Sequence, residues 1–185
     1  MARIRLAEDH ELDQDTKAVI DQIHEATGDT TALRALAHRP DILMSFMGFY
    51  GPLQMEGLLN RKLVELVRLS IAQINQCSAC LAGRYQDAFD DGLTEGLIEQ
   101  LPFAEQSDAF TDREKAAIAF AQTMASDHWS VNDDDFARLY EYFNEKEVVE
   151  LVMDVAQFIG IGRAFAVMDA MNTECSVPMA TSASA

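Results

Sequence analysis

Two cysteines one helical turn apart are the residues of this 185-residue sequence best suited to chemistry, in the segment Cys77-Ser78-Ala79-Cys80. A spacing of three places both side chains on one face of a helix, with Cys77 at its start. Backbone N–H groups and the helix dipole at that position stabilise a thiolate, the reactive form of cysteine. Two thiols at this spacing are predicted to close a disulfide and to hold and pass two electrons.

A metal site and a purely structural cysteine pair are the alternatives. Zinc needs further ligands, yet no second cysteine pair or paired histidine follows, and Cys175 is distant in the sequence. We therefore expect no metal and no cofactor. Two small core residues would also fit, because a short motif can arise by chance, but a close cysteine pair in a reducing compartment favours redox chemistry.

Glu65 and Arg84 are the charged residues predicted to accompany the cysteines. If the helices before and after Gln76 form an antiparallel hairpin, Glu65 and Arg84 lie at similar depths on its two arms. A buried glutamate could accept a proton from a thiol, and Arg84, one turn beyond Cys80, could stabilise the thiolate or pair with Glu65. The alternative is a structural ion pair from Glu65 to Arg61, Arg68 or Arg84.

The elements that must position these residues read as helices throughout. The segment from Arg61 to Asn75, which Asn60 can cap, carries apolar residues on nearly all sides, and this indicates a buried helix. Residues from Cys77 to about Asp90 are predicted to form the return helix. A further helix is expected from Pro40 to Tyr50, ended by Gly51-Pro52. Capping patterns at Thr111, Asn132 and Asn144 predict three more helix starts. No segment alternates with a period of two, so the fold is predicted to be all-α.

The domain organisation is predicted to be simple. Residues 1–175 should form a single helical domain around the central hairpin, followed by a disordered C-terminal tail over 176–185. The segment Lys62–Val67 resembles Glu147–Val152, which indicates either an internal pseudo-repeat or a chance similarity between two apolar helices.

Composition restricts the partners. The sequence has 14 basic and 31 acidic residues, a formal net charge of −17. Such a surface repels phosphate backbones and anionic lipids, so neither nucleic acid nor a membrane is an expected partner. The apolar stretch 148–171 contains five charged or amide side chains, which argues against a membrane span, and the first residues do not form a signal peptide. A cytoplasmic location and a homo-oligomer are predicted.

The spacing of Glu65 and the Cys77-x-x-Cys80 motif, twelve residues apart, resembles the carboxymuconolactone decarboxylase superfamily, and within it the AhpD-like alkylhydroperoxidase branch. The similarity extends over about residues 30–172. The family places a histidine four residues after the second cysteine, where this chain has Arg84, and its best-known members have a histidine just before that cysteine, where this chain has Ala79.

The resemblance implies a helical subunit in a trimer or hexamer that reduces hydroperoxides with electrons from a dithiol partner. Cys80 would be the peroxidatic cysteine, Cys77 the resolving cysteine and Glu65 part of the proton relay. Arginine does not shuttle protons at ordinary pH, so Arg84 is expected to act on the thiol through its charge.

Two other functions stay open at this point. A decarboxylase-like enzyme acting on a small carboxylated substrate could use Arg84 to bind the carboxylate, although the decarboxylases of the family typically lack the cysteine pair. A non-catalytic redox sensor would keep the thiols and lose turnover.

Overall fold

The computed structural model describes residues 3–171 and 178–179, and confirms the predicted all-α fold. The α-helices are α1 (Gln14–Thr27), α2 (Thr31–Leu36), α3 (Pro40–Met55), α4 (Arg61–Ile74), α5 (Ser78–Ala82), α6 (Gln86–Asp90), α7 (Glu95–Gln100), α8 (Asp112–Asp127), α9 (Asp133–Tyr140) and α10 (Glu145–Met168). The described residues also contain three 3₁₀ segments and two short strands. These are η1 (Asp9–Glu11), η2 (Leu101–Gln106), η3 (His128–Ser130), β1 (Arg84–Tyr85) and β2 (Pro178–Met179).

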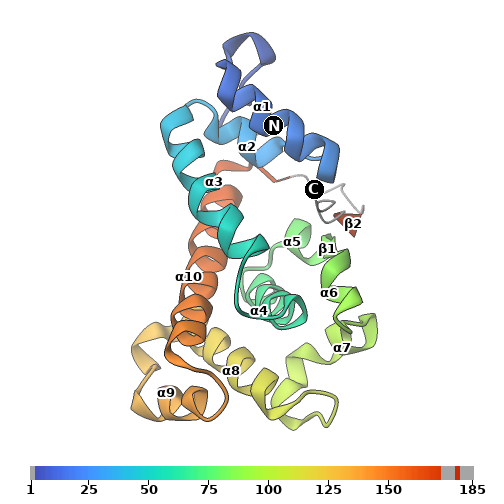
Figure 1. Cartoon of the computed structure of the whole chain (residues 1–185), viewed down its shortest axis with the longest axis vertical. Coiled ribbons are helices and arrows are strands. Elements are labelled where there is room, and N and C mark those ends of the chain that lie inside the picture. Colours follow the sequence, from blue (N-terminus) through green and yellow to red (C-terminus); the bar gives the residue numbers. More distant parts are fainter. Residues whose placement is uncertain (1–2, 172–177, 180–185) are drawn as a thin grey trace.

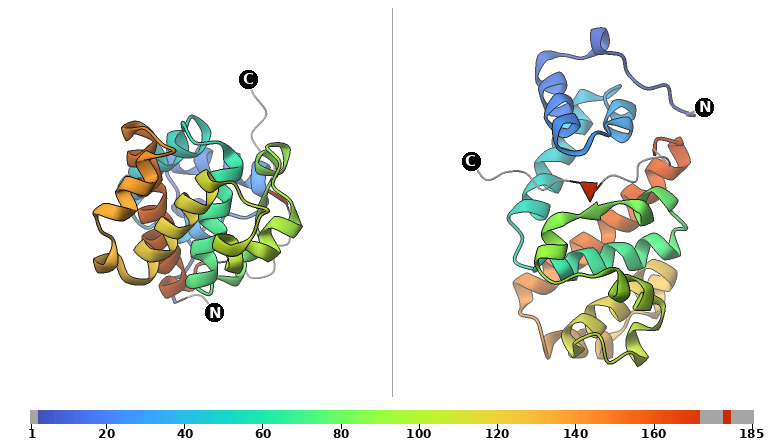
Figure 2. Two further views of the ribbon diagram at one scale, coloured as in Figure 1. Left: turned by 90° about the horizontal axis from the view of Figure 1, so that it is seen from below. Right: turned by 90° about the vertical axis from the view of Figure 1, so that its right-hand side faces the viewer.

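The helices are arranged around α4. In Figure 1, α4 lies at the centre, with α5 to α7 on one side of it and α10 on the other. Helices α1 and α2 form one end of the elongated molecule, and α8 and α9 lie toward the opposite end (Figure 2). Helices α3 and α10 run beside each other and connect the two ends. The central hairpin is thus enclosed by the rest of the chain.

Helix α4 is buried on all sides because its sequence is apolar on all sides. Every residue from Leu63 to Ala72 is buried. One face, which includes Val64 and Val67, packs against α8, α9 and α10. The opposite face, with Leu66 and Leu69, packs against α6, α7 and η2. This position between two clusters explains why the two charged residues inside α4 need partners within the protein.

The capping residues identified in the sequence begin the helices they were predicted to begin. The side chain of Asn60 accepts a hydrogen bond from the backbone N–H of Leu63 at 2.8 Å. Thr111, Asn132 and Asn144 each form a capping box at the start of α8, α9 and α10. These starts were predictable because each cap is made by residues that are close in sequence.

Helix α3 is longer than the sequence predicted, because it continues through Gly51-Pro52 to Met55. A proline normally forces the preceding residue out of the helical region, because its ring meets the side chain of that residue. Gly51 has no side chain, and this restriction is therefore relaxed. Helix α3 consequently reaches far enough to pass over α4 and α10.

The return arm of the hairpin is the second correction. The predicted helix Cys77–Asp90 is divided into α5, β1 and α6, because Gly83 takes an extended conformation with φ −64° and ψ 140°. The arm still runs antiparallel to α4. Arg61 of α4 pairs with Asp87 of α6 at 2.7 Å, while Arg68, later in α4, contacts the earlier residue Cys80.

The hairpin turns at Gln76. This residue has a left-handed φ of 52°, and the backbone N–H of Cys77 donates to the carbonyl of Ala72 at 3.0 Å. Glycine usually occupies such a position at the end of a helix, because it tolerates a positive φ without strain. The turn places Cys77 at the N-terminus of α5, as the sequence predicted.

Two predictions concern the end of the chain. The predicted tail over 176–185 falls mostly outside the described residues, although Pro178 and Met179 pair with Arg84 and Tyr85 as parallel strands. In the part of the chain that is described, α10 is the one helix long and apolar enough to cross a membrane by length and composition. That is weak evidence for a span, and α10 packs against α4 and α8 through Val148, Leu151 and Val155.

Candidate functional site

The two cysteines form a disulfide at the start of α5, with their Cα atoms 5.3 Å apart. Cys77 is the N-cap of α5, and its sulfur accepts a hydrogen bond from the backbone N–H of Cys80 at 3.1 Å. Cys77 is buried, and its sulfur lies 3.7 Å from the sulfur of Met171. Cys80 is half-buried. Of the two residues, Cys80 is therefore the one more open to a molecule from solvent.

Glu65 lies at the core of the site, where its partner is Arg68 of the same helix. The guanidinium of Arg68 donates to both carboxylate oxygens of Glu65 at 2.6 Å each. Glu65 is 1% exposed and Arg68 is 8% exposed. Burial alone would lower the pKa of Arg68, but the charge and the hydrogen bonds of Glu65 outweigh burial and raise that pKa above its ordinary value. The pair is thus a buried, bidentate ion pair.

Arg68 also holds the backbone that carries the cysteines. Its guanidinium donates to the carbonyl of Cys80 at 2.7 Å and to the carbonyl of Gly83 at 3.1 Å. These carbonyls lie at the break between α5 and β1, where helical hydrogen bonding stops. Arg68 supplies the donors that the broken helix lacks. It therefore fixes the position of Cys80 relative to α4.

Arg84 does not make the contact that was predicted for it. Its guanidinium pairs with Glu95 of α7 at 2.9 Å and donates to the carbonyls of Leu81 and Gly83. The reason is the extended conformation at Gly83, which removes Arg84 from the helix face that it would have shared with Cys80. The predicted contact between Arg84 and Glu65 is wrong, and Arg68 takes the place beside Glu65.

Two tyrosines extend the site away from the cysteines. The ring of Tyr85 lies under the guanidinium of Arg68, with 5.2 Å between the guanidinium carbon and the ring centroid. The hydroxyl groups of Tyr85 and Tyr50 are 3.5 Å apart. Burial, and to a lesser degree Tyr85, raise the pKa of Tyr50 well above its ordinary value, so its hydroxyl stays protonated. Tyr85 therefore contacts both Arg68 and the hydroxyl of Tyr50.

Sequence reasoning named Arg68 only as a possible structural partner of Glu65, an alternative that the structure confirms, and it did not select Tyr50 or Tyr85. A signal for Arg68 was present, because it lies three residues after Glu65 on one face of a helix. No local pattern connects Tyr50 to the cysteines, since α3 reaches the site only through the tertiary fold. Within the described residues, no group of three or more His, Cys, Asp or Glu side chains could hold a metal ion.

A second buried carboxyl group lies apart from the cysteines, where α3 crosses α10. Asp154 is 1% exposed, and one of its oxygens accepts from Gln54 at 3.2 Å and from Gln157 at 3.1 Å. Its other oxygen has no hydrogen-bond partner among the described residues. Burial, reinforced by the nearby charge of Glu150, raises the pKa of Asp154 from its ordinary value of 3.8 to about 7.

This raised pKa predicts a pH-dependent stability. Below pH 3.8 Asp154 is protonated in both the folded and the unfolded protein, so it does not make the free energy of unfolding depend on pH. Between about pH 4 and 7 the folded protein holds this proton more tightly than the unfolded protein does. The free energy of unfolding should therefore fall as the pH rises through this range. Asp154→Asn should remove that fall and gain about 1–3 kcal/mol over the wild type at pH 8. Urea unfolding of both proteins at pH 5 and pH 8 measures the difference, and an equal advantage at both pH values would contradict it.

Comparisons with known proteins show a family for part of the chain and a fold for nearly all of it. The model of the "Carboxymuconolactone decarboxylase family" matches residues 40–123, a region that contains α3, α4 and both cysteines of the disulfide. This region belongs to the carboxymuconolactone decarboxylase family. The resemblance that the sequence suggested is confirmed. The uncharacterized protein YdfG of Bacillus subtilis (strain 168) is 29% identical to the chain over 100 residues, which are 54% of this chain and 68% of YdfG.

Two solved structures share the fold of this chain over nearly its whole length. One is an uncharacterized peroxidase-related protein with an alkylhydroperoxidase AhpD core from Ralstonia eutropha JMP134, 21% identical, with a TM-score of 0.80 over 96% of this chain and 95% of that protein. The other is the debrominase Bmp8 in complex with 2,3,4-tribromopyrrole, 16% identical, with a TM-score of 0.76 over 94% of this chain and 92% of Bmp8. The AhpD-like helical fold is thereby confirmed.

Proposed function

We propose that this protein is a thiol-dependent peroxidase that reduces hydroperoxides through the Cys77–Cys80 dithiol. The observation that carries the proposal is the arrangement of the two sulfurs: they are bonded to each other, one in a buried residue at a helix N-terminus and the other in a more exposed residue. Membership of the matched region in an enzyme family and the AhpD-like fold support it.

The proposed reaction divides the work between the cysteines. In the reduced protein, the thiolate of Cys80 attacks the terminal oxygen of the hydroperoxide, the O–O bond breaks, and the alcohol leaves after taking a proton. Cys80 is then a sulfenic acid. The thiolate of Cys77 attacks the sulfur of Cys80 and water leaves, which forms the disulfide. An external dithiol reduces the disulfide by exchange and returns both thiols, so that two electrons pass from donor to peroxide.

The environment of Cys77 suits the reductive half of this cycle. When the donor thiolate attacks the more accessible Cys80, Cys77 must leave as a thiolate. The N–H of Cys80 already donates to the sulfur of Cys77 at 3.1 Å, and the N-terminus of a helix favours a negative charge there. Attack at Cys80 and departure at Cys77 therefore agree with both burial and hydrogen bonding.

Glu65 and Arg68 are proposed to act as positioning residues. Arg68 keeps the carbonyl of Cys80 at 2.7 Å and is itself held by Glu65. Each carboxylate oxygen of Glu65 has a further lone pair that could accept a proton. We therefore also propose Glu65 as the proton acceptor for the thiol. Arg84 pairs with Glu95 and is proposed to stabilise the loop after α5. It is not proposed to take part in a proton relay.

A turnover assay tests this function. Reduced protein with dithiothreitol as the electron donor should consume cumene hydroperoxide or hydrogen peroxide catalytically, over many turnovers per protein molecule. The same protein, alkylated at its thiols with iodoacetamide before the assay, should consume none above the rate of dithiothreitol alone. Stoichiometric oxidation that stops after one event would favour a redox sensor, and activity that survives alkylation would favour chemistry independent of the cysteines.

A further inference from the structure

Cys77 is buried at a place where the chain around it is open to solvent. The residue is 6% exposed, whereas Gln76 before it and Ser78 after it are both exposed. A side chain from the other end of the chain lies against it, because the sulfur of Met171 is 3.7 Å from the sulfur of Cys77. Met171 is half-buried, so one side of it packs on the protein and the other meets solvent. Met171 therefore belongs to the cover over Cys77.

The end of α10 directs Met171 back toward the hairpin. Asp169, the residue after α10, has a left-handed φ of 54°, and the backbone N–H of Ala170 donates to the carbonyl of Phe165 at 3.0 Å. Such a bond is typical of a helix that ends at a left-handed residue. Ala170 is fully buried. Met171 therefore follows a hydrogen-bonded turn and an anchored residue.

Two sets of contacts hold the last turns of α10 in place. The backbone N–H groups of Arg3 and Ile4 donate to the carbonyl of Met168 at 3.1 and 3.3 Å, which gives a partner to a carbonyl that the end of a helix leaves unpaired. Arg163 donates to the side-chain oxygen of Asn75 at 2.8 Å, on the turn that leads to the cysteines. The N-terminal segment and the hairpin turn thus both hold this end of α10.

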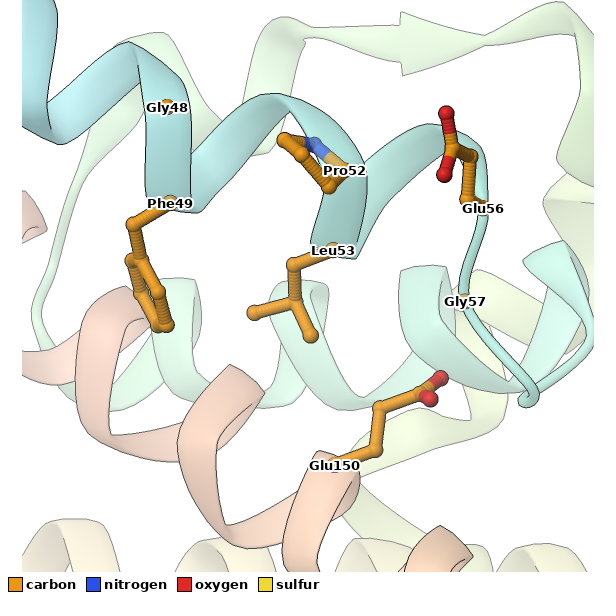
Figure 3. Close-up of a pocket in the computed structure, with 7 residues that line it drawn as sticks. All are labelled: Gly48, Phe49, Pro52, Leu53, Glu56, Gly57 and Glu150. Atoms are coloured by element: carbon orange, nitrogen blue, oxygen red, sulfur yellow. The ribbon is translucent and has the colours of Figure 1, made fainter.

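Two open hollows lie beside α10, and neither of them is lined by a cysteine. The larger, about 400 Å³, lies between the second half of α3, the turn after it and α10, where Phe49 and Leu53 point toward α10 and Glu150 points toward Gly57 (Figure 3). It borders the turn before α4, whereas Cys77 follows α4, a 14-residue helix about 20 Å long. A donor therefore reaches the disulfide at the hairpin turn itself, where the cover of each sulfur matters.

We propose that Met171 determines which sulfur of the disulfide a donor thiol attacks, because it covers Cys77 and leaves Cys80 open. This role rests on the proposed function, in which a dithiol reduces the disulfide. The donor thiolate forms a bond to the sulfur of Cys80, the bond between the two cysteines breaks, and Cys77 takes the electron pair as a thiolate. The second donor thiolate then displaces Cys80, so the donor leaves as a disulfide and two electrons stay on the protein.

A second feature favours the same direction of attack, and the two can be separated. The backbone N–H of Cys80 donates to the sulfur of Cys77 at 3.1 Å, which stabilises Cys77 as the leaving thiolate. That hydrogen bond does not involve the side chain of Met171 and does not depend on the size of the attacking thiol. A cover, by contrast, excludes large thiols more than small ones and is lost when its side chain is shortened. Attack that changes with Met171 and with thiol size therefore measures the cover.

Trapping the mixed disulfide tests the proposal. The oxidised full chain is treated with glutathione, and each cysteine that is released is blocked at once with N-ethylmaleimide. Trypsin then yields the peptide 69–84, which contains both cysteines, and tandem mass spectrometry shows which of them carries glutathione. In the wild type this should be Cys80. In Met171→Ala the share of glutathione on Cys77 should rise at least about fivefold, because access to the sulfur limits thiol–disulfide exchange.

Met171→Leu and Met153→Ala are the controls. Leucine has a similar volume and is also apolar, so Met171→Leu should keep glutathione on Cys80. Met153 is 42% exposed on α10, and its replacement by alanine should leave the site of attack unchanged. In the wild type, 2-mercaptoethanol should reach Cys77 more often than glutathione does, a comparison that needs no variant.

Two results would overturn the proposal. One is glutathione that stays on Cys80 in Met171→Ala, and the other is a wild type in which both thiols give the same share on Cys77. No step of this experiment uses peroxide. A protein that shows the expected adducts without peroxide turnover would therefore refute the peroxidase function and leave the role of Met171 standing.

Discussion

Replacing Arg68 by methionine is expected to lower the free energy of unfolding by about 3–5 kcal/mol, because Glu65 would be left charged, buried and without its partner. The guanidinium currently donates to both oxygens of Glu65 and to the carbonyls of Cys80 and Gly83. The carboxylate of Glu65 is buried, and the two carbonyls are partly buried. Urea unfolding followed by circular dichroism measures the loss.

Arg84→Met is the control, since it is the same chemical change in the return arm. Arg84 pairs with Glu95, whose side chain is 60% exposed, and an ion pair open to water contributes about 1 kcal/mol or less. Replacing both Glu65 and Arg68 by methionine should recover much of the stability that Arg68→Met loses, because no buried charge remains. A cost for Arg68→Met that is no larger than the cost for Arg84→Met would show that the buried pair does not hold the hairpin together.

Cys80→Ser is expected to reduce peroxide turnover at least about hundredfold, because the serine hydroxyl is not ionised at neutral pH and cannot attack the peroxide. Cys77→Ser should also stop turnover, but at a later step. Its Cys80 should react once and remain a sulfenic acid, which dimedone traps and mass spectrometry detects. The opposite pattern, with the trapped sulfenic acid on Cys77 in Cys80→Ser, would exchange the two roles.

Much of the fold could be predicted because its signals are local. The caps at Asn60, Thr111 and Asn144 depend on side chains and backbone groups within three or four residues of each other. The burial of α4 follows from apolar residues on all of its sides. The cysteine pair could be predicted for the same reason, since the spacing of three residues between the cysteines determines the geometry of the pair.

The errors share a physical cause, which is that tertiary contacts decided the local conformation. Gly83 is compatible with a helix, but the break there exposes carbonyls that accept from Arg84 and from Arg68, which lies fifteen residues before Gly83. Helix α3 passes through Pro52 because Gly51 precedes it and because its far end packs on α10. The choice among Arg61, Arg68 and Arg84 as the partner of Glu65 likewise depended on where the return arm bends.

The measurement that tests the central claim most directly is a single-turnover reaction of the reduced protein with hydroperoxide in a stopped-flow instrument. We predict a second-order loss of two thiols per peroxide consumed, with Cys77 and Cys80 recovered in one disulfide-linked peptide that is lighter by two hydrogens. Thiols at Cys77 and Cys80 that persist in the presence of peroxide, or a product linked mainly through Cys175, would contradict the account.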